Sequence, residues 1–129
     1  MADHPVLTLS LLPDTLAVCR LAPDADVPPW AWTGEPASVT RTRDELSIVC
    51  RADAVPEGVR AEPGWRSLKV QGPLDFALTG ILAALTAPLA AAGIALFAVS
   101  TFDTDYLLVK AENLDRAVHA LRGAGHHVE

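Results

Sequence analysis

The sequence predicts an α+β fold in which antiparallel strands pack against two helices. Half of the 129 residues are apolar, so the chain can bury a sizeable core. From Trp65 onward, strand-like and helix-like patterns follow one another in the order strand, helix, strand, strand, helix, strand. A strand, acidic corner, strand pattern also occurs twice. We therefore expect a reduced first module at residues 1–63 and a complete second module at residues 64–129.

The first module is expected to consist mainly of strands. Pro13, Asp14 and Thr15 form a turn signal between two apolar runs, which predicts a hairpin of residues 6–12 and 16–21. A Pro- and Trp-rich connection over 23–36 leaves room only for a short helix. Two further strands, 38–42 and 46–51, flank an acidic corner, and a segment over 52–63 follows that is irregular or a single helical turn.

The second module contains both expected helices. After a strand at 65–71, a helix is expected from Gly80 to about residue 92, followed by strands at 94–101 and 106–110. A second, amphipathic helix at 114–124 is ended by Gly125, and residues 126–128 can form a last short strand. This order is that of the ferredoxin-like βαββαβ unit, an antiparallel sheet with two helices on one face.

The first of these helices carries two stripes at helical spacing. One is apolar and is expected to face the sheet: Leu78, Leu82, Leu85, Leu89 and Ala92. The other is made of small residues: Gly80, Ala84, Ala87 and Ala91. Small side chains let another helix approach closely, which allows a helix-to-helix dimer contact. Alanine is also simply the best helix former, so both readings stay open.

An internal repeat relates the two modules. Residues 39–49 align without a gap on residues 99–109, at an offset of 60, with Val39 on Val99 and Glu45 on Asp105. The first module lacks a glycine-led helix, so we expect the second module to hold the functional chemistry.

Charge and hydropathy exclude several partners. The net charge is −6, from 10 basic and 16 acidic residues, and the arginines are scattered, so no nucleic acid is expected. Residues 76–102 include no charged residue and are long enough to span a bilayer, but Pro88 and Gly93 interrupt them. We expect a core helix and strand there, and no membrane partner.

The N-terminus and the cysteines both indicate a protein of the reducing cytoplasm. The N-terminus has no signal-peptide pattern, so a cytoplasmic protein is expected. Cys19 and Cys50 each lie within an apolar, strand-like run, which predicts buried free thiols in a reducing compartment.

No catalytic chemistry is visible in the sequence. It has no phosphate-cradling loop, no nucleophile elbow and no Cys-x-x-Cys pair. The four histidines have no metal-site spacing, and the adjacent His126 and His127 would point to opposite faces of a strand. We therefore expect no catalytic residue, no metal and no cofactor.

The sequence Gly80-Ile81-Leu82-Ala83, followed by Leu89-Ala90 and Gly93-Ile94, resembles the helix signature of the ACT domain family. ACT domains are small βαββαβ modules that bind amino acids and regulate metabolic enzymes. The run STFDTD at residues 100–105 is similar to the corner of the tandem-ACT subfamily, which includes the cytosolic arginine sensor of animals and small bacterial stand-alone proteins. The resemblance covers roughly residues 65–122.

This resemblance implies a set of ligand-binding residues: Gly80, Ile81, Thr101, Phe102, Thr104 and Asp105. Thr104 stands where the animal sensor has a second aromatic residue, which argues against arginine itself as the ligand. Elementary chemistry agrees with the set, because a helix N-terminus favours a carboxylate and Asp105 can accept hydrogen bonds from an ammonium group. Asp105 could alternatively serve only to cap the corner.

The expected function is that of a non-catalytic regulatory or sensor protein that binds a small molecule, an amino acid, and forms a homodimer. The alternative is a ligand-free ACT-type module for dimerisation or protein interaction.

Overall fold

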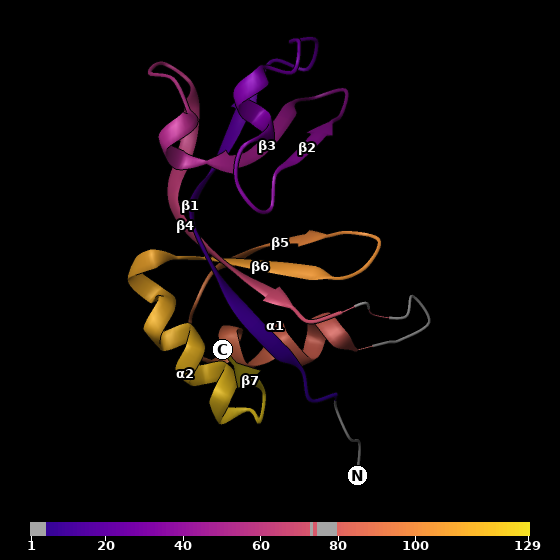
Figure 1. The fold of residues 1–129 in the computed structure, drawn as a ribbon, viewed down its shortest axis with the longest axis vertical. Helices are drawn as coiled ribbons and strands as arrows, with labels where there is room; N and C mark the ends of the chain where they lie inside the picture. Colours follow the sequence, from indigo (N-terminus) through magenta and orange to yellow (C-terminus); the bar gives the residue numbers. More distant parts are fainter. Residues whose placement is uncertain (1–4, 73, 75–79) are drawn as a thin grey trace. The chain divides into compact units, whose positions relative to one another are not determined.

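The computed structural model describes residues 5–72, 74 and 80–129, and it has the predicted α+β fold (Figure 1). Within these residues, seven strands, two α-helices and three short 3-10 helices follow one another: β1 (Thr8–Leu21), η1 (Pro29–Trp32), β2 (Ser38–Arg41), β3 (Leu46–Arg51), η2 (Ala52–Ala54), β4 (Arg60–Val70), α1 (Ile81–Ala91), β5 (Leu96–Ser100), β6 (Asp105–Lys110), η3 (Ala111–Asn113), α2 (Leu114–Gly123) and β7 (His127–Val128). Both predicted helices and the short last strand are confirmed.

The chain divides into two compact units. Unit 1 comprises Met1–Leu12 and Leu68–Glu129, and unit 2 comprises Pro13–Ser67. The long strands β1 and β4 each contribute one part to unit 1 and the other part to unit 2. The first twelve residues thus belong with the C-terminal half of the chain, and the assignment of residues 1–63 and 64–129 as two modules stays a prediction.

Unit 1 has the ferredoxin-like order β4-α1-β5-β6-α2-β7, with one additional strand. Its strands lie in the order β7, β1, β4, β6, β5. The added strand is the first part of β1, which pairs in parallel with β7 through Leu9 and Val128. At the other end, β5 and β6 form an antiparallel hairpin in which Ser100 lies opposite Asp105.

The core of unit 1 lies between this sheet and the two helices. It contains residues from the first part of β1, from β4, from β6 and from both helices, all of them buried: Leu7, Leu9, Leu68, Val70, Ile81, Leu85, Leu89, Ile94, Leu107, Val109, Ala117, Leu121 and Val128. Across the described part of the chain, no helix has the length and apolar character needed to cross a membrane.

The predicted apolar stripe of α1 needs one correction. Leu85 and Leu89 are buried as expected and Ala92 packs against the core, but Leu82 is 38% exposed. Ile81 takes its place, because positions 81, 85 and 89 lie four apart and share one face of the helix. Leu78, also predicted on this stripe, lies outside the described residues.

The predicted hairpin of residues 6–12 and 16–21 is wrong, because β1 runs without interruption from Thr8 to Leu21. Pro13 lies within it. The pairing of β1 with β7 involves Thr8 and Leu9, and its pairing with β3 begins at Leu16. On that side of β1, Pro13 therefore falls between two partner strands, where its missing N–H costs no ladder hydrogen bond.

Unit 2 is built on the hairpin of β2 and β3, and β3 also pairs with β1. Its core includes Ala31 of η1 and both cysteines, which are buried and free as predicted. The strand β4 begins at Arg60, five residues before the predicted start, and the predicted irregular segment is reduced to η2 and a few turn residues.

The internal repeat is visible in the structure, but at an offset of 59. In unit 2, Arg41 pairs with Leu46 across the four residues 42–45; in unit 1, Ser100 pairs with Asp105 across residues 101–104. The gapless alignment at an offset of 60 is therefore wrong by one residue. Since neighbouring strand residues point to opposite faces, this shift matters: the counterpart of Asp105 is the buried Leu46, not Glu45.

Candidate functional site

A cavity of about 320 Å³ lies in unit 1 between the start of α1 and the β5–β6 corner. This volume is at the lower end of the range for small-molecule sites. Ten of the described residues line it, including all six that the sequence predicted for ligand binding: Leu74, Gly80, Ile81, Leu82, Ser100, Thr101, Phe102, Asp103, Thr104 and Asp105. Two segments that are twenty residues apart in the sequence thus meet at one concave surface.

Gly80 forms the helix side of the cavity. It is the N-cap of α1 and has the left-handed conformation, with φ of 78°, which glycine adopts at little cost. A side chain here would meet no atom of the described residues within 4 Å, so none of those residues covers the backbone at the start of the helix. The first amide groups of a helix have no intrahelical acceptor and carry a partial positive charge, so they favour an anion.

The opposite side is the four-residue corner between β5 and β6. The backbone N–H of Thr101 donates to the carbonyl of Thr104 at 2.8 Å, and the Thr101 hydroxyl donates to the same carbonyl at 3.1 Å. The equivalent bonds join Thr42 and Glu45 in unit 2. This closed turn holds the corner in a defined shape.

Thr104 fastens the corner to the rest of the sheet. Its side chain is 5% exposed, and its hydroxyl donates to the carbonyl of Val70 in β4 at 2.6 Å. Gly72 packs tightly here, because a Cβ on it would lie 3.0 Å from the Asp103 carbonyl oxygen. The hydroxyl of Thr104 is therefore occupied by its bond to Val70. Thr104 contributes to the cavity mainly as part of the wall.

Asp105 is one of two aspartates among the described residues that line the cavity. It is the first residue of β6, and its Oδ1 accepts a hydrogen bond of 2.6 Å from the hydroxyl of Ser100, its partner across the hairpin. A carboxylate has about four acceptor positions, so this bond orients the group and leaves it able to accept more donors. Ser100 was not predicted as a site residue, although its position across the corner would have indicated it.

The two remaining predicted residues differ in exposure. Ile81 is 8% exposed and belongs to the core of unit 1, whereas Phe102 is 79% exposed at the rim of the cavity. The sequence reasoning missed Leu74, Leu82 and Asp103. The carbonyl of Asp103 accepts a hydrogen bond of 2.6 Å from the Leu74 backbone N–H, which joins Leu74 to the corner.

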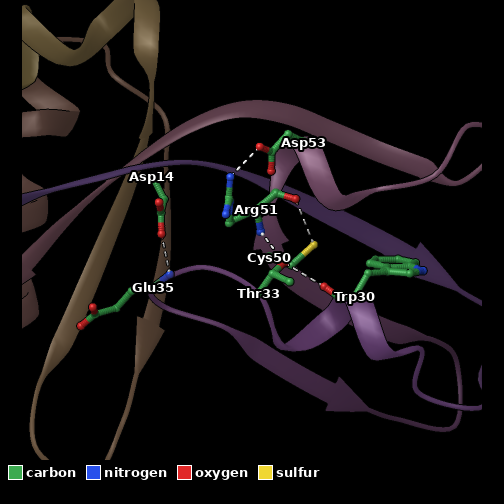
Figure 2. A network of polar contacts seen from close by, with 7 residues as sticks. All are labelled: Asp14, Trp30, Thr33, Glu35, Cys50, Arg51 and Asp53. Atoms are coloured by element: carbon green, nitrogen blue, oxygen red, sulfur yellow. Dashed lines mark hydrogen bonds and ion pairs between the residues drawn. The ribbon is translucent and has the colours of Figure 1, made fainter.

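Unit 2 contains a separate polar network (Figure 2). The Arg51 backbone N–H donates to the Thr33 hydroxyl at 3.3 Å, and that hydroxyl donates to the Trp30 carbonyl at 2.9 Å. The Arg51 guanidinium pairs with Asp53 at 2.6 Å, but both side chains are about half exposed or more. Exposed ion pairs contribute little. This network ties η1 to β3 and is structural.

The cysteines of unit 2 have the properties of inert core thiols. Burial raises the pKa of Cys19, and burial together with the neighbouring Cys19 raises the pKa of Cys50 to about 12. A nucleophilic or metal-binding cysteine needs a lowered pKa. Among the residues that the structure describes, no group of histidine, cysteine, aspartate and glutamate side chains could hold a metal ion.

Comparison with known proteins agrees with this fold. Residues 60–123 match the family model of the ACT domain, and residues 14–58, which lie within unit 2, match a second family model that describes an N-terminal domain. The cytosolic arginine sensor for mTORC1 subunit 1 of Homo sapiens is 37% identical over 59 residues, which are 45% of this chain and 18% of the sensor. The same match is found in Bos taurus. The chain thus spans less than a fifth of these curated relatives.

Solved structures extend the similarity over the whole chain. A structural-genomics protein from Agrobacterium tumefaciens is 43% identical and superposes with a TM-score of 0.92, covering 98% of this chain and 94% of that one. The regulatory subunit of aspartate kinase from Thermus thermophilus, in its ligand-free form, shares the fold at 15% identity, with a TM-score of 0.63 over 91% of this chain and 96% of that one. The chain therefore belongs to the ACT domain family, with its ACT domain at residues 60–123.

Proposed function

We propose that this protein is a non-catalytic regulatory protein that binds a small amino acid, or a closely related metabolite, in the cavity of unit 1. One observation carries the proposal: the N-terminus of α1 at Gly80 and the carboxylate of Asp105 line the same cavity. The first favours a carboxylate and the second an ammonium group, and an α-amino acid carries both.

Four further observations support a small ligand or a regulatory role. The cavity of about 320 Å³ leaves little room for a large one. Its polar groups are held in place by the Ser100–Asp105 bond and by the turn at Thr101, which reduces the entropy lost on binding. The ACT domain is a regulatory module, and the animal relative is named as an arginine sensor. The buried Thr104 in place of an aromatic wall favours a shorter ligand than arginine.

A thermal-shift screen with the proteinogenic L-amino acids tests the proposal. The wild-type protein should be stabilised by one amino acid or a few related ones. Asp105→Asn keeps an oxygen for the Ser100 hydroxyl but removes the charge, so it should weaken binding roughly ten- to a hundredfold. Asp115→Asn, the same change on the exposed face of α2, is the matched control and should bind as the wild type does. Stabilisation by no amino acid, or equal binding by both variants, would refute the proposal.

A cytoplasmic homodimer is part of the same proposal, and the dimer alone is the alternative function. Ala87 and Ala91 of α1 are exposed, so a second copy can approach this face closely. Ala87→Arg should then convert a dimer to a monomer in sedimentation velocity. If it does so and amino-acid binding persists, the cavity functions within one chain. If the protein dimerises but binds no amino acid, the interaction module is the better description.

A further inference from the structure

His126 is a buried histidine that connects three distant parts of unit 1. It is 3% exposed and lies between α2 and β7. Its Nδ1 is 3.1 Å from the backbone nitrogen of Leu7, just before β1, and its Nε2 is 3.0 Å from the carbonyl oxygen of Ala84 in α1. These partners are separated from it by 119 and 42 positions in the sequence, so the sequence alone gave no sign of them.

The two partners determine the tautomer. A backbone N–H can only donate, so Nδ1 must accept from Leu7 and cannot carry a proton. A carbonyl oxygen can only accept, so Nε2 must carry the proton and donate to Ala84. Both contacts are satisfied together only by the neutral imidazole with its proton on Nε2.

The acceptor on α1 is the carbonyl that lacks its usual donor. In an α-helix the carbonyl of Ala84 bonds to the N–H of residue 88, four positions later. Residue 88 is Pro88, which lies inside α1 and has no N–H. The Nε2–H of His126 therefore supplies, from another part of the chain, the hydrogen bond that Pro88 removes from the helix.

The same residue, Ala84, is connected to the cavity through its own N–H, which belongs to the preceding peptide group. The backbone N–H of Ala84 donates to the Gly80 carbonyl at 2.9 Å, and this bond closes the first turn of α1. Gly80, Ile81 and Leu82 of that turn line the cavity. We propose that His126 is a positioning residue: its Nε2–H, which replaces the donor missing at Pro88, holds the first turn of α1 in the geometry that an amino acid in the cavity requires.

Two amide substitutions separate the two contacts. The side-chain amide of His126→Asn reaches the place of Nδ1, so its oxygen can accept from Leu7 while the bond to Ala84 is lost. The longer side chain of His126→Gln reaches the place of Nε2, so its NH₂ can donate to Ala84 while the bond to Leu7 is lost. Each variant loses one buried hydrogen bond, so the two should be destabilised to a similar degree.

The proposal predicts that only one of them affects the cavity. In the screen with the proteinogenic L-amino acids, His126→Asn should bind the stabilising amino acid roughly three- to tenfold more weakly than the wild type, and His126→Gln should bind it within about twofold. Without any amino acid present, the Ala84 amide hydrogen should exchange faster in His126→Asn than in His126→Gln. A merely structural role would change both variants equally.

Pro88→Ala provides an independent rescue, because it restores the intrahelical donor for the Ala84 carbonyl. Adding His126→Asn to Pro88→Ala should then change neither amino-acid affinity nor Ala84 exchange. If His126→Asn alone does not fold, this double variant should fold and match Pro88→Ala. Equal Ala84 exchange in the Asn and Gln variants, or no rescue by Pro88→Ala, would overturn the proposal.

The inference rests on the proposed function, but the two can fail separately. If the wild type binds no amino acid, the proposed function fails, and the exchange and rescue measurements still decide whether His126 holds the first turn. If the wild type binds an amino acid and both His126 variants bind it equally well, only the positioning role fails.

Discussion

Adjacent residues at the β5–β6 corner have different tasks. Asp105 presents a carboxylate to the cavity, whereas the hydroxyl of Thr104 is turned inward to the carbonyl of Val70. The family resemblance could indicate both positions, but it could not distinguish these tasks. The Thr104 bond joins residues 34 positions apart, and only the pairing of the strands brings them together.

Thr104→Val should therefore lower stability. It removes the donor of a 2.6 Å hydrogen bond and leaves the Val70 carbonyl buried without it, a cost of about 1–3 kcal/mol. Thr104→Ser keeps the hydroxyl and should restore part of this loss, while Asp105→Asn should have a smaller effect on stability. Urea unfolding measures all three, and a loss in Thr104→Ser as large as that in Thr104→Val would contradict the role of the hydroxyl.

Cys50 should make stability depend on alkaline pH. Burial and the neighbouring Cys19 raise its pKa from an ordinary 9.0 to about 12, so the folded state keeps the proton when the unfolded state has lost it. The stabilisation is complete below about pH 9 and is lost as the pH rises towards about 12. The pH slope of the unfolding free energy over this range should be steeper for the wild type than for Cys50→Ala. Equal slopes in the two proteins would contradict the raised pKa of Cys50.

At the scale of the elements, local sequence signals predicted most helices and strands. They failed where contacts with residues far away in the sequence determine the conformation. Pro13-Asp14-Thr15 has turn chemistry, yet pairing with β7 and β3 on either side of Pro13 keeps β1 extended. Leu82 is more apolar than many core residues, yet the helix presents Ile81, Leu85 and Leu89 to the sheet. The register of strand pairing is the hardest feature to predict. The sequence repeat aligns at an offset of 60, whereas the two hairpins correspond at an offset of 59.

Glycine should have opposite effects at the two helices. Gly80 is the left-handed N-cap of α1, so Gly80→Ala should cost about 1 kcal/mol through backbone strain, although its side chain would meet no neighbour among the described residues. Gly123 is the last residue of α2, has no positive φ and is equally open, so Gly123→Ala should stabilise by up to about 1 kcal/mol. Thermal unfolding of both variants measures the contrast, and a change of the same sign in both would refute the account of Gly80.

For the whole molecule, the order of elements along the sequence was predictable, but the segments of the chain that make up unit 1 were not. The βαββαβ pattern over residues 65–128 indicates a complete unit, but the first part of β1 lies between β7 and β4 and completes the sheet. Nothing in residues 5–12 marks them as part of a unit whose other residues begin at Leu68. Long-range strand order follows from how the sheet buries its core, which local patterns do not record.

This insertion predicts that residues 64–129 do not fold alone as the full chain does. The fragment lacks Leu7 and Leu9, two members of the unit 1 core, and leaves β7 without the strand it pairs with. Within the full chain, Leu9→Ala should cost about 2–5 kcal/mol, because Leu9 is fully buried. Leu11→Ala, on the same strand but 36% exposed, should cost much less. Circular dichroism and urea unfolding of the fragment and both variants test this. A fragment as stable as the full chain would show that residues 64–129 form an independent module, and that β1 adds to a unit already complete.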